Sequence, residues 1–393
     1  MDITIHPSFL RGDITIIPSK SIAHRLLICA AFADRLTQLH CPQSNRDIDA
    51  TVDCLNALGA DICKTDSGFI VTPTCRIPKS GILNCCESGS SLRFLLPIVG
   101  ALGVDATFVM EGRLPQRPLS PLAEEMERMG CTLSRPTEST LRCQGKLKNG
   151  EYCISGDVSS QYITGLSFAL CLMPPGSTLR VTGQIQSKPY LDLTAEAITR
   201  FGGGHGKEGF HSPGYITVEG DWSNGAFFIT ASMLGSKLDI RGLDVHSVQG
   251  DRAILDLLPQ IAAAKPCISA AQIPDLIPIL SVAAAIHHGA VFTDIQRLRL
   301  KESDRVTSTI AMIESLGGKA EATENTLTIY GTGLTGGIVD SFHDHRIAMA
   351  AAMAATKCTK TVTILGAECV SKSYPQFWEE YTRLGGKYEQ YIR

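Results

Sequence analysis

The sequence has little that would suit a secreted, membrane-spanning or metal-binding protein. Its fourteen cysteines are scattered without a single C-x-x-C pair, and Cys85–Cys86 has no histidine or cysteine at metal-ligand spacing. The first residues show neither the basic nor the apolar stretch of a secretory signal. The apolar run over residues 94–104 is shorter than the ~18 residues of a membrane span. We therefore expect a cytoplasmic protein whose cysteines stay reduced.

Charge of either sign is also scarce. Charged residues make up 19% of the chain and the formal net charge is -3, so bulk charge favours neither a nucleic-acid nor a membrane partner. An anion-binding site would have to come from local groups of lysine and arginine. The length of 393 residues and the 44% hydrophobic content predict two domains with substantial cores.

A helix that ends in glycine before a strand recurs along the chain. Glycine favours the left-handed conformation that closes a helix. These glycines lie about 70 residues apart, except for one gap of about 115 that leaves room for a copy without glycine near Leu257–Leu258. They are Gly59, Gly130, Gly202, Gly317 and Gly385. The pattern predicts six units of roughly 60–70 residues that mix helix and strand.

A polar cluster precedes a small-residue-rich apolar helix in each unit. The clusters are Ser19-Lys20-Ser21, Ser88-Gly89-Ser90, Ser159-Ser160-Gln161, Ser223-Asn224-Gly225, Pro274-Asp275 and Asp344-His345-Arg346. Serine and aspartate are ordinary N-caps, which is the structural alternative. Helix N-termini also offer unpaired N–H groups and partial positive charge, so six of them at one cleft would bind anions. Lysine or arginine beside several clusters favours the second interpretation.

The densest charge lies in residues 299–305, where five of seven side chains are ionisable. A solvated helix start with internal ion pairs would explain the segment structurally. As a functional site it would combine Lys301 and Arg305, which bind anions, with Glu302, which can transfer a proton.

Other basic residues stand at helix starts or in loops. Lys20 and Arg25 occupy the first turns of a helix, where cations oppose the helix dipole unless an anion lies nearby. Arg117 belongs to a basic loop and Lys372 stands between two serines. His343 and His345 have no third metal ligand at a familiar spacing, so Arg346 favours phosphate or carboxylate binding there.

A glycine-rich segment over residues 204–209 matches G-x-G-x-x-G but follows a helix and precedes a strand. A dinucleotide fingerprint requires the reverse order, so we expect a loop. No segment supports ATP or NAD binding.

In their order along the chain, these clusters resemble the 5-enolpyruvylshikimate-3-phosphate synthases. The matching motifs are Lys-Ser-x-x-x-Arg at 20–25, Ser-Gly-Ser-Ser-Leu-Arg at 88–93, Arg117-Pro118, Ser159-Ser160-Gln161, Ser187-Lys188-Pro189-Tyr190, Asp275, Lys301-Glu302-Ser303-Asp304-Arg305, Asp344-His345-Arg346 and Lys372. The resemblance implies an α/β fold of two domains with three βαβαββ units each, buried helices and an interdomain cleft. Residues 14–219 would form the first domain, and residues 1–13 with 220–393 the second.

The resemblance also implies an activity and its residues. The enzyme would transfer the enolpyruvyl group of phosphoenolpyruvate to the 5-hydroxyl of shikimate 3-phosphate as a monomer, without metal or organic cofactor. Shikimate 3-phosphate would be held by Lys20, Ser21, Arg25, Ser159, Ser160, Gln161, Ser187, Asp275 and Lys301. Phosphoenolpyruvate would be held by Lys20, Gly89, Arg117, Gln161, Arg305, Arg346 and Lys372.

Three of these residues would carry the chemistry in the family's addition–elimination mechanism. Asp275 would take the proton of the 5-hydroxyl, Glu302 would protonate the methylene carbon, and Lys20 would stabilise the tetrahedral intermediate. Gly89 would leave room for the inhibitor glyphosate. Glu87, where many relatives have asparagine, and Ala23, where serine is frequent, depart from the family pattern.

Two alternatives remain open. The sister enzyme that transfers enolpyruvate to UDP-N-acetylglucosamine has the same fold, but it has a reactive cysteine that residues 111–118 lack and asparagine rather than Ser21 after the lysine. A non-catalytic phosphometabolite-binding protein would explain the cations. It would not explain Asp275 and Glu302, because added carboxylates weaken anion binding.

Overall fold

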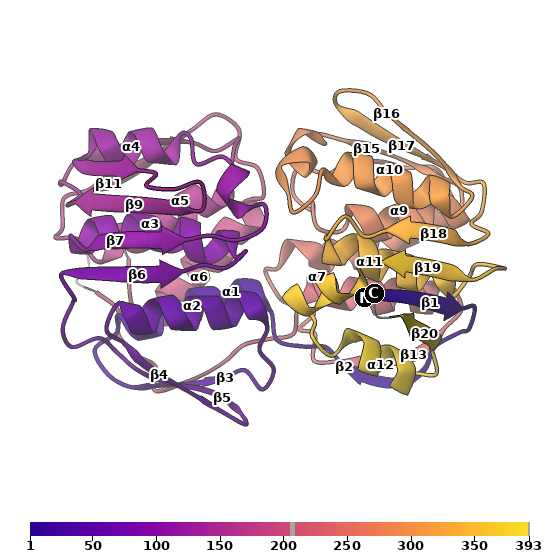
Figure 1. Ribbon diagram of the computed structural model, residues 1–393, viewed down its shortest axis with the longest axis horizontal. Coiled ribbons are helices and arrows are strands. Elements are labelled where there is room, and N and C mark those ends of the chain that lie inside the picture. The colour runs from indigo at the N-terminus through magenta and orange to yellow at the C-terminus, as the bar shows by residue number, and fades with distance from the viewer. Residues whose placement is uncertain (205–208, 392–393) are drawn as a thin grey trace. The chain divides into compact units, whose positions relative to one another are not determined.

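The computed structural model describes residues 1–204 and 209–391, and it divides into two compact units. Unit 1 comprises Met1–Ile17 and Gly220–Arg393, and unit 2 comprises Pro18–Glu219. The glycine-rich motif at 204–209 follows a helix and precedes a strand, and its residues 205–208 lie outside the described part. Figure 1 shows the chain coloured from indigo to yellow.

Unit 2 is a mixed α/β structure. Its strands are β3 (Thr37–His40), β4 (Asp61–Thr65), β5 (Gly68–Thr72), β6 (Ser80–Asn84), β7 (Asp105–Val109), β8 (Cys131–Ser134), β9 (Thr140–Gly145), β10 (Glu151–Ser155), β11 (Thr178–Thr182) and β12 (Tyr215–Thr217). Its helices are α1 (Lys20–Ala31), α2 (Arg46–Ala57), α3 (Gly89–Leu102), η1 (Leu114–Gln116), α4 (Leu122–Arg128), α5 (Ser160–Cys171) and α6 (Lys188–Arg200).

Unit 1 has the same mixture of elements. Its strands are β1 (Asp2–His6), β2 (Arg11–Thr15), β13 (Lys237–Arg241), β14 (Cys267–Ser269), β15 (Ala290–Thr293), β16 (Lys319–Ala322), β17 (Thr326–Tyr330), β18 (Gly337–Asp340), β19 (Val362–Leu365) and β20 (Lys387–Tyr391). Its helices are α7 (Trp222–Met233), η2 (Gly250–Ala253), α8 (Ile254–Ala263), α9 (Ile277–Ile286), η3 (Gln296–Leu300), α10 (Arg305–Ser315), α11 (His345–Ala355), η4 (Ala367–Lys372) and α12 (Phe377–Arg383).

One sheet pattern recurs in both units. The orders β6-β7-β9-β8 and β14-β15-β17-β16 each begin with a parallel pair, and the other neighbours are antiparallel. The orders β12-β3-β5-β4 and β18-β19-β1-β20 repeat this pattern. Two further sheets, β10-β11 and β13-β2, have only the parallel pair. The predicted repeat is confirmed. Some sheets include strands from distant parts of the chain, such as β1 beside β19 and β12 beside β3.

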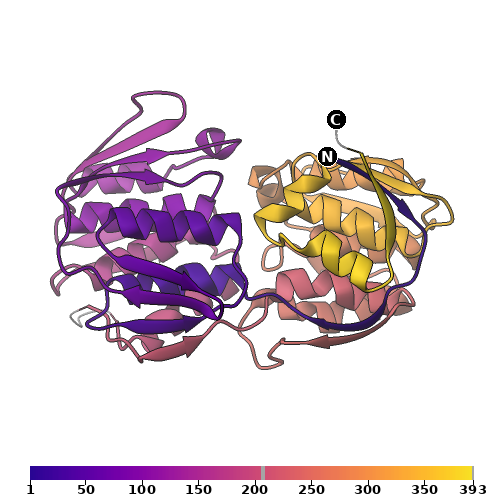
Figure 2. The same ribbon diagram turned by 60° about the horizontal axis from the view of Figure 1, so that its bottom comes forward.

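The first strand of the chain completes the last repeat. β1 lies between β19 and β20 and pairs antiparallel with both, so Asp2 is opposite Tyr391. Figures 1 and 2 show the indigo strand beside the yellow C-terminal elements. Both ends of the described chain therefore belong to one sheet of unit 1.

The helix caps follow the predicted chemistry. Ser88 and Asp344 accept hydrogen bonds from backbone N–H groups at the starts of α3 and α11, and Ser159 does the same for α5. The five predicted C-terminal glycines, Gly59, Gly130, Gly202, Gly317 and Gly385, all have positive φ, from 63° to 110°. Two starts differ from the prediction: Asp221 rather than a residue of the Ser223 cluster caps α7, and α9 begins at Ile277, after Leu276 rather than after Asp275. Ser19 precedes α1 without a side-chain capping bond. The copy without glycine is α8.

Each unit has its own buried core. In unit 2, α3 and α5 run side by side, and almost every residue of α3 is buried (Figure 1). In unit 1, α7, α9 and α11 pack against one another, and every residue of α11 is buried. Small side chains such as the alanines of α11 allow helices to be enclosed on all sides. Helix starts inside such packing hold their side chains in fixed positions.

Candidate active site

A network of buried charges surrounds Arg305 at the start of α10 in unit 1. Its Nη1 donates to Asp275 Oδ1 at 2.5 Å, and its Nη2 donates to Glu302 Oε2 at 2.7 Å. Its Nε donates to Asp344 Oδ2 at 2.8 Å. The Arg305 side chain is 1% exposed, so these charge-assisted bonds are shielded from water. The predicted acids and one predicted cation therefore form a single cluster.

Asp275 is shared by three cations. Besides Arg305, Arg346 Nη2 lies 3.1 Å from its Oδ2 and Lys301 Nζ lies 3.4 Å from its Oδ1. Burial opposes ionisation of Asp275, but Arg346, Lys301 and Arg305 hold its pKa well below the ordinary value. In this state Asp275 is a carboxylate able to accept a proton.

Lys301 is the cation of this cluster that responds most readily to pH. Burial lowers its pKa from 10.5 to about 8, although Asp275 opposes that shift. Its side chain is 19% exposed, so it reaches the edge of the buried network.

Asp344 fixes the start of α11. Its Oδ1 accepts from the Arg346 backbone N–H at 3.0 Å, and its Oδ2 accepts from Ser303 Oγ at 3.0 Å as well as from Arg305. Burial opposes its ionisation, yet Arg305 holds its pKa below the ordinary value. Asp344 thus orients the Arg305 guanidinium and caps the helix that begins beside Arg346. Lys372 ends η4, which packs against α11.

The first half of unit 2 contains Lys20 at the start of α1. Lys20 Nζ donates to Asp47 Oδ2 at 2.8 Å, and both side chains are largely buried. The cation that opposes the α1 dipole therefore has an acid of the protein itself as its partner. Asp47 could not be selected from sequence, because an acidic residue in the first turn of α2 is ordinary helix chemistry.

Arg25 is held in place from α6. Its Nε donates to Thr194 Oγ1 at 2.9 Å and its Nη2 to the Tyr190 carbonyl at 2.9 Å, while Nη1 donates to the Ser21 carbonyl at 2.6 Å. Burial lowers the pKa of Arg25 to about 10, which leaves it charged at neutral pH. Ser187, the residue before α6, has φ of 55°, a conformation uncommon outside glycine. Such strain is found where function fixes a backbone.

A second group of unit 2 residues gathers at the starts of α3 and α5. Arg93 Nη1 donates to Gln161 Oε1 at 3.1 Å, and Gln161 Nε2 donates to Ser90 Oγ at 3.1 Å. A Cβ atom at Gly89 would lie 2.6 Å from Arg93 Nη1 and 2.9 Å from Arg117 Nη1. Glycine therefore lets two guanidinium groups approach this helix start. Ser159 and Ser160 begin α5 beside them.

The predicted residues thus form separate groups. Unit 1 brings together Asp275, Lys301, Glu302, Arg305 and Arg346. In unit 2, Arg25 contacts the carbonyl of Ser21, while Gly89 lies beside Arg117. Thr194 was missed because a threonine within a helix normally bonds to its own backbone, as Thr194 also does with Tyr190.

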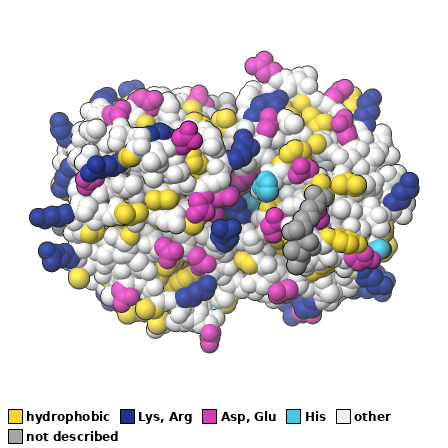
Figure 3. Space-filling view, in the orientation of Figure 1, with side chains coloured by type: hydrophobic (Ala, Val, Ile, Leu, Met, Phe, Trp, Pro, Cys, Tyr) yellow, Lys and Arg dark blue, Asp and Glu magenta, His cyan; other side chains and the backbone are white. Residues whose placement is uncertain are grey.

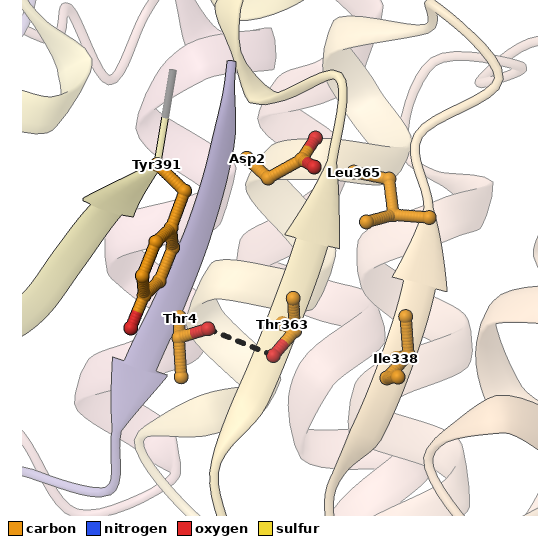
Figure 4. Close-up of a pocket in the computed structure, with 6 residues that line it drawn as sticks. All are labelled: Asp2, Thr4, Ile338, Thr363, Leu365 and Tyr391. Carbon is orange, nitrogen blue, oxygen red and sulfur yellow. Dashed lines mark hydrogen bonds between the residues drawn. The ribbon is translucent and has the colours of Figure 1, made fainter. Parts of the chain in front are cut away.

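On the visible face of each unit in Figure 3, acidic and basic side chains are interspersed. A depression of about 450 Å³ lies on the β18-β19-β1-β20 sheet, where Thr4 Oγ1 and Thr363 Oγ1 are 2.9 Å apart (Figure 4). Its other lining residues are Asp2, Ile338, Leu365 and Tyr391, and none of the six lining residues is a predicted site residue.

Among the described residues, no helix is long and apolar enough to cross a membrane.

Comparison with known proteins gives a consistent result. The family model for EPSP synthase (3-phosphoshikimate 1-carboxyvinyltransferase) matches residues 5–381. The 3-phosphoshikimate 1-carboxyvinyltransferase of Clostridium kluyveri is 37% identical over 99% of this chain and 98% of its own length. That of Clostridium acetobutylicum is 36% identical over 98% and 97%. The solved EPSP synthase of Acinetobacter baumannii has a TM-score of 0.80 and 22% identity, over 99% of this chain and 100% of its own.

The relatives and the matching fold define a carboxyvinyl transferase. Within that class, the chain belongs to the EPSP synthase family. It is an enzyme of the shikimate pathway that transfers the enolpyruvyl group of phosphoenolpyruvate to the 5-hydroxyl of shikimate 3-phosphate and releases phosphate. The UDP-sugar alternative is not favoured, because these relatives are named for the phosphoshikimate acceptor.

Proposed function

We propose that the two units divide the recognition of the substrates as follows. In unit 2, shikimate 3-phosphate is bound by Lys20, Ser21, Arg25, Ser159, Ser160, Gln161 and Ser187. In unit 1, Asp275 and Lys301 contact its hydroxyl and carboxylate groups. The support lies in Arg25: a charged guanidinium held by three oxygen acceptors has a fixed direction, as bidentate recognition of phosphate requires.

Phosphoenolpyruvate is assigned to a second set of groups. These are Lys20, Gly89, Arg117 and Gln161 in unit 2, and Arg305, Arg346 and Lys372 in unit 1. The close approach of Arg117 to Gly89 supports the assignment, because a helix N-terminus beside a guanidinium favours an anion. The Arg305 and Arg346 side chains are at most 5% exposed, so a bound anion would meet them with little screening.

The chemistry proceeds by addition and elimination. Asp275 takes the proton of the 5-hydroxyl while that oxygen bonds to the central carbon of phosphoenolpyruvate. Glu302, which takes up a proton when the anionic substrates offset the charge of Arg305, gives that proton to the methylene carbon. Lys20 stabilises the charge of the tetrahedral intermediate. Loss of phosphate then restores the double bond as the former methylene carbon returns its proton to Glu302. No metal or organic cofactor takes part in this scheme.

Binding of the substrates prepares Asp275 for this role. In the free protein, Arg305, Arg346 and Lys301 favour its ionised form and make it a weak base. Anionic substrates that engage the same cations offset their positive charge, which raises the pKa of Asp275. Asp275 therefore becomes a stronger base when the substrates bind. The enzyme gains this basicity in the complex in which the 5-hydroxyl proton must be removed.

The observation that carries this proposal is the contact of Asp275 and Glu302 with one arginine, Arg305. We expect Glu302→Gln to lower kcat for phosphate release by about 100-fold or more with both substrates supplied, because general acid–base catalysis contributes about that much. Glu314→Gln, an exposed position on α10, is the matched control and should retain full activity. Undiminished kcat in a folded Glu302→Gln enzyme would refute the assignment.

We also propose that the enzyme is a cytoplasmic monomer. All fourteen cysteines are free thiols, as suits a reducing compartment. Each unit encloses its own core, so folding requires no partner subunit. Light scattering should give a mass near 42.2 kDa at micromolar concentration, and a doubled mass would contradict the monomer.

A further inference from the structure

Asp251 is a buried carboxyl group of unit 1 that the mechanism does not use. Asp251 lies in η2 and is 4% exposed. Its Oδ2 accepts a hydrogen bond from Ser223 Oγ near the start of α7. Its Oδ1 is buried and has no hydrogen-bond partner among the residues that the structure describes. A buried carboxylate with one unpartnered oxygen is costly, because water no longer solvates its charge.

Charged groups on three neighbouring segments act on Asp251. Arg346, at the start of α11, favours its ionisation, while Asp275 before α9 and Asp221 before α7 disfavour it. On its own element, Arg252 is turned away, with Nη1 donating to the Val245 carbonyl at 3.1 Å. Burial, followed by the repulsion of Asp275, raises the pKa of Asp251 to about 7.

The charges of the described cluster balance without Asp251. Arg305, Arg346 and Lys301 are paired with Asp275, Glu302 and Asp344. Arg346, which the proposed function assigns to phosphoenolpyruvate, interacts electrostatically with Asp251, so an ionised Asp251 would add one negative charge that acts on its guanidinium. That charge would compete with an anionic ligand for the same guanidinium.

We propose that Asp251 is a positioning residue whose proton controls the binding of phosphoenolpyruvate by Arg346. Protonated Asp251 adds no charge that competes with the substrate anion for Arg346, whose guanidinium also bonds to Asp275, whereas ionised Asp251 attracts that guanidinium. The inference rests on the proposed role of Arg346. It assigns Asp251 no proton transfer to or from a reacting atom.

The test compares Asp251→Asn with the unaltered enzyme across the pH range. Asparagine has the same shape and can still accept from Ser223, but it stays neutral. At saturating shikimate 3-phosphate, kcat/KM for phosphoenolpyruvate should be equal in both enzymes near pH 6. At pH 8 the variant should be about tenfold better, because the competent protonated form of the unaltered enzyme falls about tenfold per pH unit above the pKa of Asp251.

A second variant separates proton control from a purely structural role. Ser223→Ala removes the hydrogen bond that favours ionised Asp251. The fall in kcat/KM should therefore begin at higher pH than in the unaltered enzyme. A ratio of Asp251→Asn to unaltered activity that stays constant from pH 6 to 8.5 would overturn the proposal, as would an unmoved profile in Ser223→Ala.

Infrared spectroscopy detects the carboxyl proton of Asp251 directly, so this test does not depend on enzyme activity. The infrared difference between the unaltered enzyme and Asp251→Asn at pH 6 should show the carbonyl band of a protonated carboxylic acid, lost by pH 8.5. No such band would overturn the proposal. The band together with a constant activity ratio would also overturn it, and would then point to a failure in the role of Arg346, which Arg346→Gln tests through KM for phosphoenolpyruvate.

Discussion

Arg305 and Asp275 are joined by a 2.5 Å contact between Nη1 and Oδ1, and the same guanidinium also bonds to Glu302 and Asp344. One arginine therefore fixes the positions of three carboxylates relative to one another. A lysine cannot do this, because its ammonium group is a point charge rather than a planar fork.

Replacement of this arginine tests the network. We expect Arg305→Lys to lower kcat/KM for phosphoenolpyruvate by at least about 100-fold and to destabilise the protein by about 3–5 kcal/mol, since breaking a buried ion network leaves acids unpaired. Steady-state kinetics and urea unfolding measure the two effects. Arg299→Lys is the control: Arg299 is 38% exposed and pairs with Asp304, so a change above about 1 kcal/mol there would contradict the reasoning.

The helix start at Gly89 gives a second prediction. In Gly89→Ala the new methyl group would meet Arg93 and Arg117 at less than 3 Å, so at least one guanidinium must move. We expect KM for phosphoenolpyruvate to rise about tenfold, the loss of roughly one charge-assisted hydrogen bond. We also expect glyphosate inhibition to weaken by a larger factor, because the family resemblance implies that Gly89 leaves room for the inhibitor. Equal inhibition constants in both enzymes would exclude this role of Gly89.

Lys301 predicts a loss of activity at alkaline pH. Its pKa of about 8 means that its positive charge disappears as pH rises through that value. Since Lys301 is assigned to shikimate 3-phosphate, kcat/KM for that substrate should fall about tenfold per pH unit above pH 8. Lys301→Arg keeps the charge and should flatten the alkaline limb, whatever its absolute rate. An alkaline limb of unchanged midpoint in that variant would assign the fall to another group.

His24 predicts the response of unit 2 to acid. It is fully buried in α1, where its Nδ1 lies 2.7 Å from Thr51 Oγ1, and burial lowers its pKa to about 3. The unfolded chain takes up a proton at this position below pH 6.5, whereas the folded chain does not until about pH 3. Stability from this group is therefore complete above pH 6.5 and falls as pH drops towards 3.

The measurement is the urea-unfolding midpoint at pH 7, 5.5 and 4.5. We expect a steady decrease in the unaltered protein and a smaller one in His24→Gln, which has no charge to gain. Parallel decreases in both proteins would show that other groups cause the acid sensitivity.

Local chemistry explains which features the sequence predicted. The glycines after five helices take left-handed conformations, and Ser88, Ser159 and Asp344 cap helices, because each depends only on neighbouring residues. The contacts of Asp47 with Lys20 and of Thr194 with Arg25 join segments far apart in the chain. Nothing in the residues around Asp47 or Thr194 indicates those partners.

The same reasoning applies to Asp251. In the sequence it follows a glycine and precedes an arginine, which suggests an exposed turn. It is buried where η2 packs against α7, a helix that begins 29 residues earlier. Sequence patterns gave the residue types of the cluster, while the long-range packing decides which of its acids are protonated.

The pairing of Asp2 with Tyr391 has a consequence for rearranged versions of this chain. Opposed residues in antiparallel strands lie within about 6 Å, so a short flexible peptide could bridge the two termini. New ends opened after Ile17 and before Gly220 would turn unit 1 into one uninterrupted polypeptide. In that polypeptide, about half the size of the full chain, spectroscopy could follow the protonation of the acids around Arg305.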